Sequence, residues 1–287
     1  MTNFIEIIKA VFYGIVEGVT EWLPVSSTGH LILFEEFFGF NLSESFIEMF
    51  RVVIQLGAIL AVIILFWNKL FPWTGKKTEY EKKQTYRLWI MVIVACLPAA
   101  VIGLLFDDLL DKVFYNFPTV AITLILYGIA FIVIENLNKK GKIRESLTSI
   151  DRMPIKTAFL IGVFQLLSLI PGTSRSGSTI LGAMILGCSR VVSAEFSFFL
   201  AIPVMIGASL LKVMKFGLDV AAGEAAITSN EVIVLIVGMV VAFAVSLLCI
   251  RFLMNFIKRH DFKVFGWYRI ALGAVLLIYF AGTFLFK

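Results

Sequence analysis

The sequence has little charge: Asp, Glu, Lys and Arg make up only 16% of its 287 residues, whereas 60% are hydrophobic. Soluble domains carry about 25% charged and roughly 45–50% apolar residues. The uncharged runs are long enough for helical spans of about 17–25 residues. No segment alternates polar and apolar residues, which argues against a membrane β-barrel. The composition therefore excludes a soluble domain and predicts an all-α polytopic membrane protein.

Several familiar motifs are also missing. The chain contains no Gly-x-Ser-x-Gly, Walker A or His-Glu-x-x-His sequence, which argues against common soluble hydrolases and ATP-driven machines. Its three cysteines have no metal-ligand spacing, so we interpret them as packing residues. The net charge of +5 comes from loops between apolar runs, where basic residues set membrane orientation. We therefore predict no nucleic-acid partner.

Two apolar segments are interrupted by polar residues. The first, residues 4–38, breaks at Pro24, and the second, residues 157–187, breaks at Pro171. The arms on either side of each break are too short to be convincing spans. Irregular backbone at membrane depth is tolerated only inside protein or beside a cavity. Each segment therefore predicts a re-entrant helical hairpin.

Six other segments have the length and composition of transmembrane helices. They are Phe50–Trp67, Leu88–Phe106, Thr119–Ile134, Phe196–Leu211, Val232–Ile250 and Ile270–Phe286. A short acidic turn is predicted at 107–112, and strongly basic loops are predicted at 68–87, 135–156 and 251–269.

The two halves of the chain resemble each other. At a shift of 147 residues, the difference between Ile8 and Ile155, five of seventeen positions coincide around the breaks. The same shift pairs Ser27 with Ser174. We therefore predict two repeats within a single membrane domain. Residues 1–137 hold hairpin 4–38 and three spans, and residues 154–287 hold hairpin 157–187 and three spans.

Three spans in each half force an inverted topology. All three basic loops then fall on one face, which the positive-inside rule places in the cytoplasm. Both termini and the opening of the site are predicted to lie outside. The hairpins enter from opposite sides and their tips meet near the midplane, as in secondary transporters built from inverted repeats with broken helices.

The first break carries two carboxylates that share a helical face. Glu17 and Glu21 are four residues apart and would repel each other without a proton or cation between them. Hard cations such as Mg²⁺ or Ca²⁺ take oxygen ligands, and Mg²⁺ commonly joins carboxylates to phosphates. We predict a divalent-cation site or an acid/base pair here. A structural salt bridge to Arg51 or Arg175 is the alternative.

Hydroxyl groups and a histidine follow these carboxylates. Ser26, Ser27 and Thr28 stand where the second arm begins, and a helix N-terminus suits a phosphate group. Plain helix capping would account for only one of the three. His30, one of two histidines, lies about one helical turn after Ser27, which indicates a general acid/base role.

The second break is complementary to the first. Its glycines, such as Gly172, let successive N–H groups form an anion-binding nest, and Arg175 adds a planar fork suited to phosphate oxygens. Pairing of Arg175 with Glu17, Glu21 or Glu195 is the alternative. A phosphorylated lipid fits the composite site, because its tail can stay in hydrocarbon while its head reaches the polar residues. The other polar residues of this break are Ser174, Ser176 and Thr179.

Two motifs in these breaks resemble the undecaprenyl-diphosphate phosphatase family, also called bacitracin-resistance proteins. One is Glu17-Gly-Val-Thr-Glu21 followed by Ser-Ser-Thr-Gly-His30, and the other is Pro-Gly-Thr-Ser-Arg-Ser-Gly-Ser-Thr over residues 171–179. The resemblance extends over essentially the whole chain. It implies hydrolysis of undecaprenyl diphosphate to undecaprenyl phosphate and inorganic phosphate, dependence on a divalent cation, and a place in the bacterial plasma membrane. The product recycles the lipid carrier of peptidoglycan synthesis.

The resemblance also implies roles for individual residues. Glu17 and Glu21 bind the metal or position water, Ser27 is the candidate nucleophile with His30 as its acid/base partner, and either of these two could attack phosphorus. Ser174, Arg175 and Thr179 hold the diphosphate. A transporter or flippase of a phosphorylated lipid or anion is the main alternative function, and a structural scaffold is a third. The oligomeric state stays open, with a homodimer among the alternatives.

Overall fold

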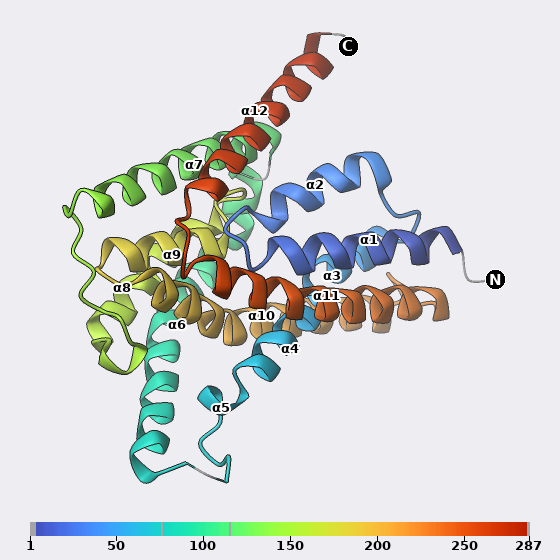
Figure 1. The fold of residues 1–287 in the computed structure, drawn as a ribbon. Coiled ribbons are helices and arrows are strands. Elements are labelled where there is room, and N and C mark those ends of the chain that lie inside the picture. Colours follow the sequence, from blue (N-terminus) through green and yellow to red (C-terminus); the bar gives the residue numbers. More distant parts are fainter. Residues whose placement is uncertain (1–3, 76, 115, 286–287) are drawn as a thin grey trace. The chain divides into compact units, whose positions relative to one another are not determined.

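The computed structural model describes residues 4–75, 77–114 and 116–285, which are helices and connecting turns without a β-strand (Figure 1). The α-helices are α1 (Phe4–Thr20), α2 (Ser27–Phe38), α3 (Glu44–Val53), α4 (Gln55–Leu65), α5 (Trp67–Leu70), α6 (Glu79–Phe114), α7 (Phe117–Lys139), α8 (Ile155–Gln165), α9 (Arg175–Ile185), α10 (Arg190–Ala221), α11 (Ser229–Phe256) and α12 (Lys263–Leu285). Two 3-10 helices, η1 (Ile150–Arg152) and η2 (Leu166–Leu169), complete these ranges.

Within the described ranges, six helical segments are long and apolar enough to cross a membrane. They are Glu44–Leu65, Glu79–Gly103, Phe117–Lys139, Arg190–Ala221, Ser229–Phe256 and Lys263–Gly282. The shorter helices α1, α2, α8 and α9 flank the two breaks, where hairpins are predicted. The chain is therefore an all-α, multi-pass membrane protein with six spans, as its composition predicts.

All six spans begin earlier than predicted, and capping boxes start two of them, α6 and α11. The Thr78 N–H and hydroxyl donate to the Glu81 carboxylate while the Thr78 hydroxyl accepts from the Glu81 N–H, so α6 begins within the predicted basic loop 68–87. Thr228 and Glu231 form the same box before α11. Such reciprocal bonds satisfy N–H groups that a helix start leaves without intrahelical partners.

Three further predicted connections are partly wrong. The basic loop 135–156 is shorter, since α7 continues to Lys139 and α8 begins at Ile155. The acidic turn at 107–112 lies inside α6, which continues to Phe114 because no Gly or Pro interrupts it after Gly103. The predicted loop 251–269 is shorter, since α11 ends at Phe256 and α12 begins at Lys263. Arg269 is therefore a helical residue rather than a loop residue.

The chain packs as two compact units. Unit 1 comprises residues 1–22, 30–67 and 201–251, and unit 2 comprises residues 23–29, 68–200 and 252–287. Each unit takes segments from both halves of the sequence. This division by packing is separate from the predicted division into repeats 1–137 and 154–287, which stays a prediction.

Unit 1 has an aromatic core around Tyr13 of α1. The Tyr13 ring lies 4.9 Å from Phe34, 4.6 Å from Phe40 and 5.8 Å from Phe50. One residue further along α1, a Cβ on Gly14 would stand 2.7 Å from the carbonyl oxygen of Gly238 in α11. Only glycine allows the two helices to approach this closely, so the core side of α1 is held against α11.

Unit 2 is organised around the pair α7 and α12, which run alongside each other (Figure 1). A Cβ on Gly128 would stand 2.6 Å from the Gly266 carbonyl oxygen, and a Cβ on Gly273 would stand 2.7 Å from the Ala121 carbonyl oxygen. Small residues let helix backbones pack closely in membranes. The glycines therefore let α7 and α12 pack closely along this seam.

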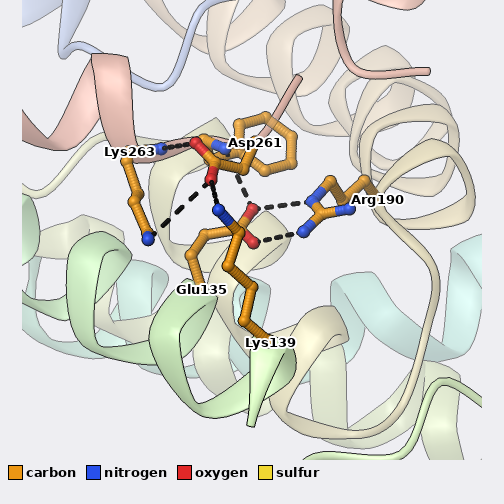
Figure 2. Close-up of polar contacts among 6 residues, drawn as sticks. Glu135, Lys139, Arg190, Asp261 and Lys263 are labelled. Carbon is orange, nitrogen blue, oxygen red and sulfur yellow. Dashed lines mark hydrogen bonds and ion pairs between the residues drawn. The ribbon is translucent and has the colours of Figure 1, made fainter. Parts of the chain in front are cut away.

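A buried ion pair fixes the ends of this helix pair (Figure 2). The fully buried Glu135 carboxylate of α7 accepts from Arg190 Nε at 2.8 Å and Nη2 at 2.5 Å. The same carboxylate accepts the Phe262 N–H at 2.9 Å. Lys139 pairs with Asp261 at 3.3 Å beside it. These contacts tie the start of α10 and the turn before α12 to the end of α7.

Candidate functional site

Both helix breaks lie in unit 2 and share an unusual turn. Ser26 and Ser174 have φ values of +74° and +72°, and no other non-glycine residue in the described ranges has a positive φ. The Ser26 hydroxyl accepts the Gly29 N–H at 3.3 Å, and the Ser174 hydroxyl accepts the Gly177 N–H at 3.2 Å. Left-handed backbone at a residue with a side chain costs of order 1–3 kcal/mol and is typical of functional sites.

The two turns change the sequence shift that relates the predicted repeats from 147 to 148 residues. Their common shift is 148, the difference between Ser26 and Ser174, so the predicted pairing of Ser27 with Ser174 is wrong. Helices α2 and α9 begin at Ser27 and Arg175, which also differ by 148. The two turns therefore place a hydroxyl and a guanidinium at equivalent positions, Ser27 and Arg175.

Arg269 joins the two breaks. Its side chain is fully buried, and Nη1 donates to the Pro24 carbonyl at 3.1 Å. Its Nη2 donates to the carbonyls of Gly172 at 2.8 Å and Thr173 at 3.0 Å. Ser176 adds a second link, because its hydroxyl donates to the Leu23 carbonyl at 3.4 Å. The structure thus brings the Pro24 and Pro171 breaks together within one compact unit.

The charge of Arg269 is not neutralised by an acidic side chain in the described ranges. Its remaining contacts are the Leu124 carbonyl, 3.5 Å from Nε, and the ring of Tyr127, whose centroid is 5.3 Å from the guanidinium carbon. A positive charge therefore stands between two helix N-termini, which carry partial positive charge of their own. This arrangement favours a bound anion.

Gly172 is required by its conformation as well as by its carbonyl. Its φ is +88°, and a Cβ would overlap the Thr123 hydroxyl and approach the Val120 carbonyl oxygen to 2.7 Å. The Thr123 hydroxyl donates to the Pro171 carbonyl at 2.8 Å. The second break is therefore packed directly against α7.

Polar side chains surround the start of α9. Arg175 Nη1 donates to the Ser197 carbonyl at 2.7 Å, and the hydroxyls of Thr179 and Ser197 are 2.7 Å apart. The hydroxyls of Ser174 and Ser176 are 3.1 Å apart. Ser197 of α10 was not predicted. Its signal is a serine in an apolar span, at i+4 from another buried serine, Ser193.

Two residues of the predicted alternative ion pairs, Glu195 and Arg51, have ion-pair partners within their own units. Glu195 pairs with Lys69 at 2.7 Å in unit 2. Arg51 pairs with Glu35 in unit 1.

The predicted carboxylates lie in unit 1. Glu17 is fully buried and Glu21 is 6% exposed. The Glu21 N–H donates to the Glu17 carbonyl at 3.0 Å, so the helical turn continues beyond Thr20 and keeps the four-residue spacing. Among the described residues, no three His, Cys, Asp or Glu side chains gather into a metal site. Two carboxylates suit a Mg²⁺ ion that completes its coordination with phosphate and water.

The predicted site is shared between the two units. Ser26, Ser27 and Thr28 belong to unit 2 with the whole second break. His30, partly buried in the first turns of α2, belongs to unit 1 with Glu17 and Glu21. The approach of these three side chains to the second break stays a prediction.

Comparison with known proteins decides the family. Residues 10–275 match the family described as bacitracin resistance protein BacA. The chain belongs to this family.

Curated relatives match almost the full length. An undecaprenyl-diphosphatase of Acetivibrio thermocellus is 59% identical over 276 residues, which cover 96% of this chain and 98% of the relative. One from Enterococcus faecalis is 58% identical over 279 residues, with the same coverage. Another from Streptococcus mutans is 57% identical over 277 residues, covering 96% of each chain.

Arg269 acts as a clamp, because its side chain donates to carbonyls of both breaks. We therefore predict that Arg269→Gln loosens both breaks at once. Each hydrogen bond to a charged group contributes about 1.5–3 kcal/mol. Since 1.4 kcal/mol corresponds to a factor of ten, amide hydrogen exchange at residues 23–29 and 172–177 should quicken at least about tenfold. Mass spectrometry of the detergent-solubilised protein measures both segments.

Arg87→Gln is the matched control, because it removes a guanidinium of the same unit that donates to the Met153 carbonyl instead of to the breaks. It should leave exchange at both breaks unchanged. Faster exchange at only one break in Arg269→Gln would contradict the clamp.

Proposed function

We propose that this chain is a membrane phosphatase that hydrolyses undecaprenyl diphosphate to undecaprenyl phosphate and inorganic phosphate. The observation that carries the proposal is the near full-length identity of 57–59% to proteins named undecaprenyl-diphosphatase. The reaction recycles the lipid carrier of peptidoglycan synthesis in the bacterial plasma membrane. It also accounts for resistance to bacitracin, the property for which the family is described.

The geometry of unit 2 supports binding of the diphosphate head. Two helix N-termini, α2 and α9, begin at serine turns that Arg269 links through carbonyls on both sides. N–H groups in the first turn of a helix have no intrahelical acceptor and bind phosphate oxygens. Arg175, one residue after its serine turn, supplies a further charged fork. The apolar surface of the spans keeps the polyprenyl tail in hydrocarbon.

The reaction requires a nucleophile, a proton acceptor and stabilisation of charge on phosphorus. An oxygen nucleophile attacks the terminal phosphorus, and the bridging P–O bond breaks to release the lipid monophosphate. Either the Ser27 hydroxyl attacks with His30 accepting its proton, or His30 attacks directly. Arg175 and the two serine turns hold the phosphate oxygens. A Mg²⁺ or Ca²⁺ ion bound by Glu17 and Glu21 would supply further charge stabilisation.

A transporter or flippase of a phosphorylated lipid is the second candidate. Pairs of short helices with polar breaks are typical of transporters with inverted repeats. The basic loops favour an orientation in which both termini and the opening of the site lie outside the cytoplasm.

Hydrolysis and transport differ in their need for a sealed membrane. We expect purified protein in detergent to release phosphate from undecaprenyl diphosphate, as measured colorimetrically. Ser27→Ala, His30→Ala and Arg175→Ala should each lower the rate at least about 100-fold, because each removes a group in contact with the reacting phosphate. Lys82→Ala, in an exposed ion pair with Glu79, is the control with an unchanged rate. No phosphate release in detergent, together with movement of the intact lipid across the membrane of sealed vesicles, would favour the transporter.

Removal of divalent cations should abolish the same activity. Glu17 and Glu21 are buried at a spacing of four residues and repel each other unless a cation or a proton lies between them. We expect EDTA to stop phosphate release and added Mg²⁺ or Ca²⁺ to restore it. Full activity in chelator would instead indicate that the two carboxylates act through protons alone.

A further inference from the structure

Gln165, the last residue of α8, is buried in an unusual way. It is 1% exposed, and within the described ranges neither its Oε1 nor its Nε2 has a hydrogen-bond partner. Its backbone carbonyl, by contrast, accepts the Ser168 hydroxyl at 2.7 Å. Buried amides almost always have partners, because leaving one unpaired costs free energy. An amide that is buried without a partner in the described chain is therefore a candidate contact for a bound ligand.

In the predicted internal repeat, Gln165 is equivalent in sequence to a predicted site residue, Glu17. The shift of 148 set by the two serine turns pairs Gln165 with Glu17. The buried stripes of the two helices agree with this pairing. Ala10, Tyr13, Gly14 and Glu17 are buried on α1, and Ala158, Ile161, Gly162 and Gln165 are buried at the same four positions on α8.

The connection after Gln165 leads directly to the anion-binding turn. Helix η2 follows at once, and the Thr173 hydroxyl lies 2.8 Å from the carbonyl oxygens of both Leu167 and Ile170. These bonds fold residues 166–173 into a compact turn that ends at Ser174. Gln165, the Ser174 turn and Arg175 all belong to unit 2.

We propose that Gln165 is a further substrate-binding residue, whose Nε2 donates a hydrogen bond to a phosphate oxygen of the bound lipid diphosphate. This inference rests on the proposed phosphatase function. The amide is neutral and carries two donors, so it binds an anion without the cation or proton that a carboxylate needs. The two repeats thus use one position in different ways, with Glu17 on the cation and Gln165 on the phosphate.

Gln165→Leu separates a binding role from a structural one. The amide has no hydrogen-bond partner among the described residues, so without substrate the substitution should leave the thermal unfolding midpoint unchanged or raise it. With substrate, kcat/KM for phosphate release should fall about tenfold or more, because the phosphate oxygen loses its donor. Gln165→Glu keeps the shape but adds negative charge, and should lower kcat/KM further.

Gln84→Leu is the matched control. The Gln84 Oε1 is likewise buried without a partner in the described ranges, but it lies near the start of α6, away from both breaks in the sequence. This variant should keep both the unfolding midpoint and kcat/KM of the wild type. A reduced kcat/KM in Gln165→Leu alone then reports on the substrate.

Two outcomes would overturn the inference. One is wild-type kcat/KM in Gln165→Leu, and the other is an unfolding midpoint that falls in parallel with activity, which would show a structural role. A wild-type protein that releases no phosphate would defeat the proposed function instead. Thermal stabilisation by inorganic pyrophosphate then still tests Gln165, since the variant should require about tenfold more of this ligand for the same shift.

Discussion

The structure of unit 2 depends on one buried guanidinium. Arg269 donates to carbonyls of both helix breaks, so neither break can move without breaking bonds to the same side chain. A buried arginine needs exact placement, which the glycine seam of α7 and α12 and the Glu135–Arg190 pair supply. Carbonyl groups of both breaks accept hydrogen bonds from Arg269. The N–H groups at the starts of α2 and α9 are therefore the groups suited to an anion.

The two breaks have the same backbone but different chemistry. Ser26 and Ser174 have matching φ values and cap equivalent glycines. One residue later, the first turn presents Ser27 and the second presents Arg175. The proposed nucleophile Ser27 and the proposed phosphate-binding residue Arg175 thus occupy equivalent positions of two similar turns. The helices before the two turns also differ in chemistry, because α1 carries the acidic Glu17 where α8 carries the neutral Gln165.

The sequence predicts the fold better than it predicts the site. Six spans follow from long apolar runs, and the breaks follow from Pro24, Pro171 and their polar neighbours. The starts of α6 and α11 differ from the predicted starts because the Thr78 and Thr228 capping boxes lie in polar segments that resemble loops. Their signal, threonine followed three residues later by glutamate, is visible in the sequence.

The role of Arg269 could not be predicted from the sequence in the same way. The sequence predicts that Arg269 belongs to a basic loop, because Lys258, Arg259 and Lys263 precede it. Its partners are carbonyls at positions 24, 124, 172 and 173, and carbonyls leave no trace in a sequence. Only its position in the apolar segment that follows Lys263 could have marked it as an intramembrane charge with a function.

We propose that the two serine turns, at Ser26 and Ser174, form one phosphate-binding site. A structure with a bound, non-hydrolysable diphosphate analogue tests it most directly. We expect phosphate oxygens of the analogue within about 3 Å of N–H groups in the first turns of both α2 and α9. Arg269 should still donate to carbonyls of both breaks. Phosphate bound to only one turn, or away from both, would contradict it.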